Sequence, residues 1–236
     1  MADTRPGSHF QVKMTWAVTT DRESVDAQAA IAQDDMVLAQ VMAGEAPATI
    51  RIWQTPQCIA VPRHFSLHDR FDDAALTLAD RGWPITLRSS GGSAMPQGPG
   101  VLNVSMVFPH DRPMSIEAGF QMLTDPLCGF FESLGLPASA GSVPGSFCDG
   151  RYNLVVDQRK IAGTAQRRKK RALLAHAALQ IDLDLEAICN SINYLNEKID
   201  RVERCQPDAA TTVAMVLGQA MSAAEIEQQL VTFFRG

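Results

Sequence analysis

Three predicted strands follow one another closely between positions 152 and 181, and they constrain the fold more than any other feature of this sequence. They cover Tyr152–Val156, Lys160–Gln166 and Leu173–Ile181, with connecting segments of only three and six residues. Parallel neighbours need a much longer crossover connection, whereas antiparallel neighbours are joined by short turns. The sequence therefore predicts an antiparallel meander in this part of the chain.

Helices and further strands precede the meander. The chain from Asp21 to Ala43 contains no glycine or proline, and its apolar residues recur at helical spacing until Gly44, which can end a helix. This stripe consists of Val25, Ala29, Ala32, Met36, Ala39 and Ala43. Two more helices are predicted over Phe71–Arg81 and Ser115–Leu134. Strands are predicted over Thr49–Trp53, Cys58–Val61, Ile85–Arg88 and Val101–Phe108.

Apolar and polar residues alternate along the last of these strands. Asn103 and Ser105 stand between apolar neighbours, which are Leu102, Val104, Met106 and Phe108. Successive side chains of a strand point to opposite faces of the sheet. We therefore expect one buried face and one face that can present polar groups.

The composition changes toward helix after Asp182. One apolar stripe consists of Ile192, Leu195, Ile199 and Val202. Ser222 and Glu225 have the spacing of a capping box, ahead of a helix that would bury Ile226, Leu230 and Phe233. We predict an α+β fold, with a mostly antiparallel sheet and helices on one side of it. A catalytic domain would cover residues 1–182, and a helical C-terminal extension packed on it would cover residues 183–236.

The charge and the cysteines exclude several classes of protein. A net charge of −5 and a pI near 5.5 argue against a general nucleic-acid binder. No apolar run approaches the ~20 residues that a membrane span needs. The five cysteines are scattered, without a Cys-x-x-Cys pair, which argues against a metal site or a disulfide framework. Such cysteines suit a reducing compartment, so we expect the cytoplasm.

The glycine-rich segment Arg88–Ala94, which follows a predicted strand, is the first candidate for chemistry. Glycines let the backbone approach a ligand closely and leave N–H groups free for an anion or a carbonyl. The segment lacks the Gly-Lys-Ser/Thr ending of a Walker loop and the GxGxxG spacing of a dinucleotide site. Taken alone, such a segment is more often an ordinary turn.

Cys148 and Lys160 are the candidates for reacting groups. Cys148 precedes a strand and stands near Arg151, where a thiol is both reachable and close to positive charge. A lone cysteine is otherwise a small core residue. Strand alternation predicts one shared face for Lys160, Ala162, Thr164 and Gln166. A lysine on such a face could polarise the carbonyl group of a ligand, although an isolated lysine is usually a surface residue.

Five basic residues at positions 167–171 separate the last two strands of the meander. Like charges in a tight turn are normally solvated. The functional alternative is a docking patch for an acidic protein or a contact for a phosphate. His176, on the next strand, could face Cys148, but a histidine among alanine and leucine is more often a core residue.

The order and spacing of these segments resemble the family of lipoate–protein ligases and octanoyl- and lipoyl-transferases, which is related to biotin protein ligase. The most specific motifs are Arg88-Ser-Ser-Gly-Gly-Ser-Ala94 and Lys160-Ile-Ala-Gly163-Thr-Ala-Gln166. Between them lies Gly100-Val-Leu-Asn103-Val-Ser105. The resemblance covers about residues 30–182 and implies a biotin/lipoate ligase-like catalytic domain.

The resemblance implies an acyl tunnel between the Gly-Gly segment and the Lys160 strand. The substrate-binding residues that it implies are Arg88, Ser90, Gly91, Gly92, Asn103, Gly163, Ala165 and Gln166. The implied catalytic residues are Cys148 and Lys160. The segment 148–154 looks most like the branch of cysteine-dependent lipoyl/octanoyl amidotransferases, which hold the acyl group as a thioester. Lys160 would hold the acyl carbonyl and stabilise its oxyanion.

Two positions depart from the pattern of the ligases. Ser89 stands where many ligases have a second arginine, and the segment 97–100 replaces an acidic approach to the next strand. Both departures weaken the case for ATP chemistry, which needs groups for phosphate and Mg²⁺.

We therefore expect a lipoyl or octanoyl group to pass first to Cys148 and then to a lysine of an acidic carrier, without a cofactor. That carrier would be a lipoyl-domain protein or a glycine-cleavage H-type protein. One alternative is a lipoate–protein ligase that uses ATP and Mg²⁺ to form an acyl-adenylate, in which Cys148 is only structural. The others are a carrier that binds the acyl group without turnover and a Cys148–His176 hydrolase that releases free acid.

Overall fold

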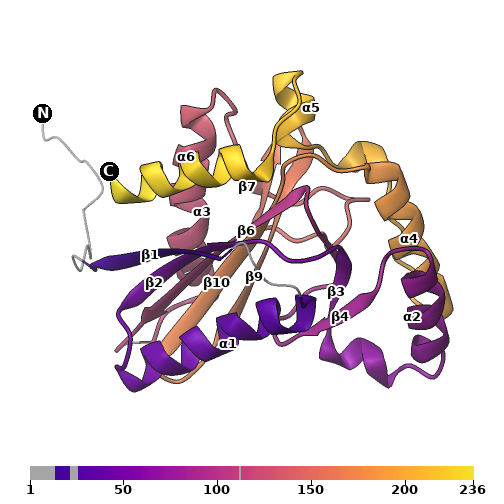
Figure 1. The fold of residues 1–236 in the computed structure, drawn as a ribbon, viewed down its shortest axis with the longest axis horizontal. Helices are drawn as coiled ribbons and strands as arrows, with labels where there is room; N and C mark the ends of the chain where they lie inside the picture. Colours follow the sequence, from indigo (N-terminus) through magenta and orange to yellow (C-terminus); the bar gives the residue numbers. More distant parts are fainter. Residues whose placement is uncertain (1–13, 22–25, 112) are drawn as a thin grey trace, which may run out of the picture.

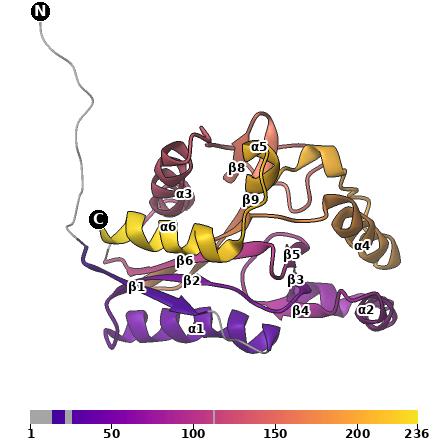
Figure 2. The same cartoon turned by 45° about the horizontal axis from the view of Figure 1, so that its top comes forward.

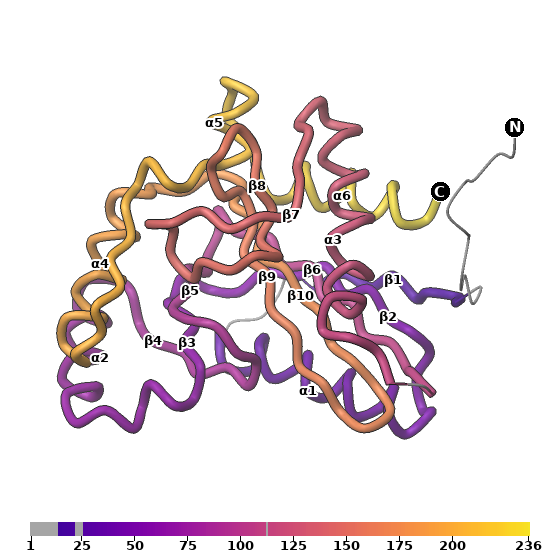
Figure 3. The backbone as a smooth tube through the Cα atoms, turned by 180° about the vertical axis from the view of Figure 1, so that it is seen from behind, coloured from indigo at the N-terminus to yellow at the C-terminus, as the bar shows by residue number. Residues whose placement is uncertain are grey.

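A seven-stranded sheet forms the centre of the protein, shown in Figure 1 as a computed structural model that describes residues 14–21, 26–111 and 113–236. Its strands, in spatial order, are β1 (Trp16–Asp21), β2 (Ala48–Trp53), β6 (Val101–Pro109), β10 (Ala172–Gln180), β9 (Arg159–Arg168), β8 (Asn153–Val156) and β7 (Ser139–Gly141). Neighbours are antiparallel except β1 and β2, which are parallel. The predicted meander is confirmed as β8, β9 and β10, whose backbone can be followed from behind in Figure 3.

A second, three-stranded sheet carries the start of the glycine-rich segment. It consists of β4 (Ile85–Arg88), β3 (Cys58–Pro62) and β5 (Met95–Gln97), with β3 in the middle. The sequence analysis missed β1, β5 and β7. Two of these are three-residue strands inside loops rich in small residues, where pairing depends on distant partners and not on a local pattern.

Helices cover both faces of the large sheet, so the prediction of helices on one side is wrong. Figure 2 shows α1 (Ala27–Ala43) on one side and α3 (Ile116–Ser133) and α6 (Ala223–Arg235) on the other. Both faces of the central strand β10 are buried. Nearly all of its side chains are apolar, so its sequence does not alternate between buried and exposed residues. The same holds for β6, where Asn103 and Ser105 are 2% and 0% exposed. Their polar face therefore looks into the interior.

The first helix has the boundaries that its sequence signals predict, apart from its start. The side chain of Asp26 caps the helix by accepting from the backbone N–H groups of residues 28 and 29, and Gly44 ends it in a left-handed conformation at φ 78°. Asp21 belongs to β1, and Val25 of the predicted stripe lies outside the described residues. The predicted stripe is otherwise wrong, because most of its residues are exposed, Met36 to 53%. The buried face of the helix consists of Ala30, Asp34, Val37, Leu38 and Val41. The helix places two neighbouring aspartates, Asp34 and Asp35, beside the sheet.

The remaining helices pack partly on a second hydrophobic core. There α2 (Phe71–Asp80) lies against α4 (Leu185–Lys198) over the small sheet. The short helices are η1 (Arg63–Leu67), η2 (Pro207–Ala209) and α5 (Val213–Leu217). The C-terminal α6 contacts β6, β1 and β2, and the division of the chain at Asp182 stays a prediction. Within the described residues, no helix is both long and apolar enough to cross a membrane.

The C-terminal stripes are confirmed in part. Ile192, Leu195 and Ile199 are buried, and the capping box of Ser222 and Glu225 is present. Val202 is 90% exposed, because α4 ends at Lys198 and helical spacing no longer applies beyond it. In α6, Ile226 and Leu230 are buried while Phe233 is 39% exposed.

Candidate active site

Cys148 stands in the loop between β7 and β8, in a backbone conformation that few residues adopt. Its φ is 51°, in the left-handed region, where a residue with a Cβ is disfavoured by about 1 kcal/mol or more. Its carbonyl oxygen accepts hydrogen bonds from Lys160 Nζ and Asn153 Nδ2, each at 3.0 Å. The next residue, Asp149, accepts from Val143 N at 2.8 Å. The surrounding contacts thus fix the peptide that carries the thiol.

The glycine-rich segment lies directly against the Cys148 sulfur. The backbone N–H of Ser93 donates to Cys148 Sγ at 3.1 Å. A Cβ built on Gly92 would lie 2.9 Å from the same sulfur and 3.0 Å from Arg88 Nη2. The sequence prediction that these two segments belong to one site agrees with this geometry, because the thiol is half-buried beside a backbone donor and a guanidinium.

Arg88 is occupied with its own loop. It is 6% exposed and donates to Ser90 Oγ at 2.8 Å, to Ser93 O at 2.7 Å and to the carbonyl of Gly91. Burial lowers the pKa of Arg88 from its usual value. The guanidinium therefore shapes the Gly-Gly segment from within, and Gly91 itself lies on the exposed side of the loop.

Lys160 is completely buried and is directed at the backbone of the Cys148 loop. Its ammonium donates to the carbonyl oxygens of Phe147 and Cys148, at 2.5 Å and 3.0 Å. Burial lowers the pKa of Lys160 from 10.5 to about 8. An ammonium has three donors, so one remains for a further acceptor.

A bulge in β9 explains the direction of Lys160. Leu154 and Val155 are consecutive in β8, yet they pair with Ala162 and Lys160, which leaves Ile161 as an extra residue in β9. The alternation of faces shifts by one position at this point. The predicted common face of Lys160, Ala162, Thr164 and Gln166 is therefore wrong. The side chain of Lys160 instead extends over Gly163. A Cβ built on Gly163 would lie 3.1 Å from Lys160 Nζ.

The burial of Lys160 predicts a pH dependence of stability. Its folded-state pKa of about 8 lies below the ordinary 10.5, so the unfolded state binds more protons between these two pH values. The penalty for burying the charge is complete below pH 8 and disappears as the pH rises toward 10.5. The free energy of unfolding of the wild type, relative to Lys160→Met, should therefore rise by about 3 kcal/mol across this window in urea titrations. A flat or falling difference would contradict the assignment.

A cavity extends from Cys148 toward α1 as two pockets of about 330 and 350 Å³, which include space open to solvent. The residues that line both pockets are Ala60, Arg88, Gln97, Asn103 and His176. The pocket at Cys148 is completed by Met95, Gly163, Thr164, Ala165 and Ala178. The pocket at α1 is completed by Ile31, Asp34, Trp53, Ser89, Ser90 and Leu174. A Cβ on Gly163 would lie 2.9 Å from the Met95 side chain, so this glycine keeps the cavity open.

Five of the eight predicted wall residues line this cavity, but Gly91, Gly92 and Gln166 do not. Arg88, Ser90, Asn103, Gly163 and Ala165 line it. The side chain of Gln166 donates to the carbonyl of Ile116 at the start of α3, at 3.0 Å. The sequence analysis did not identify the cavity residues Met95 and Gln97, because they belong to the unrecognised strand β5.

Several polar side chains in the cavity are paired with one another. Gln97 and Asn103 form a reciprocal amide pair, with N···O distances of 3.1 and 2.7 Å. His176 Nε2 lies 2.9 Å from Ser90 Oγ. Burial, together with the charge of Arg88, lowers the pKa of His176 to about 3. His176 is therefore neutral near pH 7 and pairs with Ser90, so the geometry does not support a Cys148–His176 catalytic pair.

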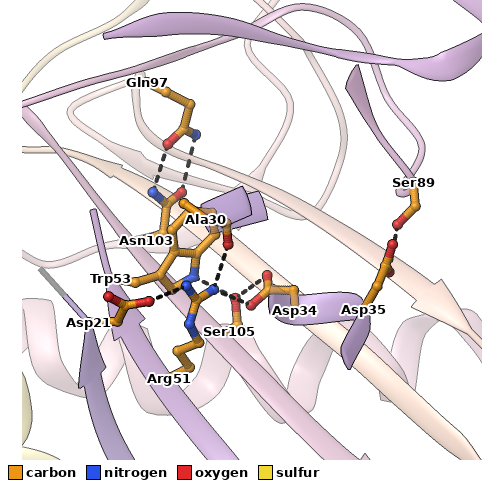
Figure 4. A network of polar contacts seen from close by, with 10 residues as sticks. All are labelled: Asp21, Ala30, Asp34, Asp35, Arg51, Trp53, Ser89, Gln97, Asn103 and Ser105. Carbon is orange, nitrogen blue, oxygen red and sulfur yellow. Dashed lines mark hydrogen bonds and ion pairs between the residues drawn. The ribbon is translucent and has the colours of Figure 1, made fainter. Parts of the chain in front are cut away.

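A buried ionic network lies at the α1 end of the cavity (Figure 4). Arg51 donates to Asp34 and Asp21, each at 2.8 Å. Ser105 donates to Asp34 at 2.6 Å and accepts from Trp53 Nε1 at 2.9 Å. Burial raises the pKa of Asp34 above its usual value. This network was not predicted from the sequence. Asp34 and Arg51 are charged residues within largely apolar elements, and that pattern could have indicated a buried ion pair.

Removing Asp34 should strongly destabilise the protein. In Asp34→Ala the guanidinium of Arg51, which is 3% exposed, would lose a buried counter-ion. Breaking a buried ion pair in this way costs about 3–5 kcal/mol, measurable by urea denaturation. The neighbouring Asp35→Ala is a matched control, because its partner Arg167 is partly exposed and such a pair contributes about 1 kcal/mol or less. Equal losses in the two variants would refute the role of the network.

The basic turn consists of residues 167–171, and its first two side chains have partners within the protein. Arg167 forms an ion pair with Asp35. The same carboxylate accepts a hydrogen bond from Ser89 Oγ at 2.8 Å, which is drawn in Figure 4. Arg168 donates to the carbonyl of Ser115 at 3.1 Å. Lys169, Lys170 and Arg171 are exposed at the tip. Among the residues that the structure describes, no group of three or more His, Cys, Asp or Glu is arranged to hold a metal ion.

Comparisons with known proteins identify similar sequences and folds. Residues 26–235 match the family described as the lipoyl protein ligase A/B catalytic domain. An octanoyl-GcvH:protein N-octanoyltransferase from Kyrpidia tusciae is 32% identical, over 86% of this chain and 74% of its own. A lipoyl-GcvH:protein N-lipoyltransferase from Listeria monocytogenes is 31% identical, over 70% of this chain and 60% of its own.

A solved structure has the same fold. It is a putative lipoate protein ligase from T. acidophilum with bound lipoic acid, with a TM-score of 0.72 and 19% identity. The match covers 94% of this chain and 85% of the other. It confirms the predicted α+β architecture, in which a mostly antiparallel sheet is flanked by helices.

Proposed function

Because the chain belongs to the lipoyl protein ligase A/B catalytic domain family, we propose that it transfers a lipoyl or octanoyl group to a lysine of a carrier protein through a thioester on Cys148. The family consists of acyltransferases and ligases, and the relatives named above are transferases. One observation carries the proposal. A half-buried thiol, held in a left-handed conformation, lines a cavity together with Arg88, the residue that begins the Gly-Gly segment.

The chemistry consists of two acyl transfers. The thiolate of Cys148 attacks the carbonyl carbon of an acylated donor, and the donor group leaves with a proton. The amine of the target lysine then attacks the thioester, which forms the amide, releases a proton and restores the thiolate. The remaining donor of Lys160 would stabilise the oxyanion of each tetrahedral intermediate. When the donor is a carrier acylated on a lysine, one amide is broken and another is formed overall, so this route needs no nucleotide.

An ATP- and Mg²⁺-dependent ligase is the alternative, and one solved relative with this fold is a lipoate-protein ligase A bound with ATP. The residues of this chain fit that chemistry poorly. Ser89 stands where many ligases have a second arginine, and the neighbouring Arg88 already donates to the backbone carbonyls of Gly91 and Ser93. We therefore keep lipoate or octanoate as the acyl group and propose no nucleotide step.

The partner that we propose is a glycine-cleavage H-type protein or another lipoyl-domain protein. The Kyrpidia and Listeria relatives carry GcvH in their names. The exposed side chains of Lys169, Lys170 and Arg171 offer positive charge to an acidic carrier, which would accelerate its association. The five cysteines are free thiols, which supports a reducing compartment, and we propose the cytoplasm.

The proposal is tested by intact mass spectrometry. The protein is incubated with an octanoylated or lipoylated H-type carrier without ATP, and samples are then treated with hydroxylamine. We expect an acyl adduct that hydroxylamine removes and that Cys148→Ser does not form. Modification of the acceptor only after addition of ATP, Mg²⁺ and free lipoate would instead identify a ligase. Release of free acid would identify a hydrolase. Binding of the acyl group without any product would identify a carrier.

A further inference from the structure

The carbonyl of Cys148 has a second donor besides Lys160, and that donor is the side chain of Asn153. Asn153 is 2% exposed and begins strand β8. Its Nδ2 donates to Cys148 O at 3.0 Å, and its Oδ1 accepts from Thr164 N at 2.9 Å. One amide thus connects the peptide of the thiol with the strand that lines the cavity.

We propose that Asn153 is a positioning residue that holds the Cys148 sulfur against the backbone N–H of Ser93. This inference rests on the proposed function, in which Cys148 is the nucleophile. Asn153 does not itself touch the sulfur. It acts through the carbonyl of the same residue.

The backbone conformation of Cys148 supplies the physical reason. A residue at φ 51° relaxes unless its surroundings over-determine it. Without the amide, the Cys148 carbonyl keeps only the contact with Lys160. Rotation of this peptide would move the sulfur away from Ser93 N, which donates a hydrogen bond to it at 3.1 Å. A displacement of about 1 Å at a reacting atom can cost about 10²-fold in rate.

Two variants separate this role from simple packing. Asn153→Ala removes both hydrogen bonds, and Asn153→Asp keeps the volume and the acceptor for Thr164 N but loses the donor to Cys148 O. A matched control is Asn193→Ala, because Asn193 makes the same two kinds of bond, to Cys205 O at 2.9 Å and from Cys205 N at 2.8 Å. That link joins α4 to the following loop and does not involve the cavity.

The measurement is the rate of Cys148 alkylation by iodoacetamide from pH 6 to 9, followed by peptide mass mapping, alongside the melting temperature. We expect both Asn153 variants to react about tenfold more slowly than the wild type at pH 7, and Asn193→Ala to react at the wild-type rate. Asn153 variants within about twofold of the wild type, or an equal slowing in Asn193→Ala, would overturn the inference. Alkylation needs no acyl transfer. Slow alkylation in the Asn153 variants, with no acyl adduct in the wild type, would therefore uphold the positioning role and reject the proposed function.

Discussion

Cys148→Ser is expected to reduce transfer of the acyl group to the carrier by about 10³-fold or more. A hydroxyl is not ionised near neutral pH, and a serine nucleophile needs an adjacent general base. The nearest candidate, His176, is neutral, has a pKa of about 3 and is bonded to Ser90. The rate of appearance of modified carrier, followed by mass spectrometry, measures the effect.

The control for this substitution is Cys128→Ser. Cys128 is a half-buried thiol on α3, away from the cavity residues, and burial raises its pKa. Its replacement should leave the transfer rate within about twofold of the wild type. If Cys148→Ser transfers the acyl group at the wild-type rate, the thiol has only a packing role and is not the nucleophile.

Gly92→Ala is expected to reduce transfer by about 10²-fold. The new Cβ would lie 2.9 Å from Cys148 Sγ and 3.0 Å from Arg88 Nη2, and the backbone at φ 102° disfavours any residue with a side chain. The sulfur or the guanidinium must move, and a small displacement of the nucleophile has a large effect on rate. The hydroxylamine-labile adduct should therefore form slowly.

The adjacent Gly91→Ala is the matched control. No described heavy atom lies within 4 Å of a Cβ built on Gly91, and this glycine is exposed and does not have a positive φ. Its transfer rate should stay within about twofold of the wild type. Equal losses in Gly91→Ala and Gly92→Ala would mean that the loop as a whole is sensitive and that the contact with Cys148 is not the cause.

Local patterns were sufficient to predict most of the secondary structure. Short connections predicted the meander, and glycine at position 44 ended the first helix where expected. Patterns of period two and 3.6 do not show which elements cover which face, so the sequence predicted the helix α1 but not its position on the second face of the sheet. The same limitation hid β5, in which Met95 pairs with Ala60 of β3, 35 residues earlier in the chain.

The candidate site was predicted as a set of segments and not as a geometry. The motifs predicted that the Gly-Gly segment, Cys148 and Lys160 belong together, and the structure places them in contact. The direction of Lys160 depends on the bulge at Ile161, which alternation alone cannot show. Gln166 was expected at the cavity because the resemblance to the family implied it, although its side chain bonds to the start of α3.

The most direct test of the central claim is a single-turnover chase. The acyl-enzyme is formed with an acylated carrier, separated from the donor, and mixed with unmodified acceptor carrier in the absence of ATP. A thioester intermediate on Cys148 predicts that the acyl mass leaves the enzyme at the rate at which the amide appears on the acceptor lysine. An acyl-enzyme that persists while the acceptor stays unmodified would show that the adduct is not an intermediate, and would contradict the mechanism.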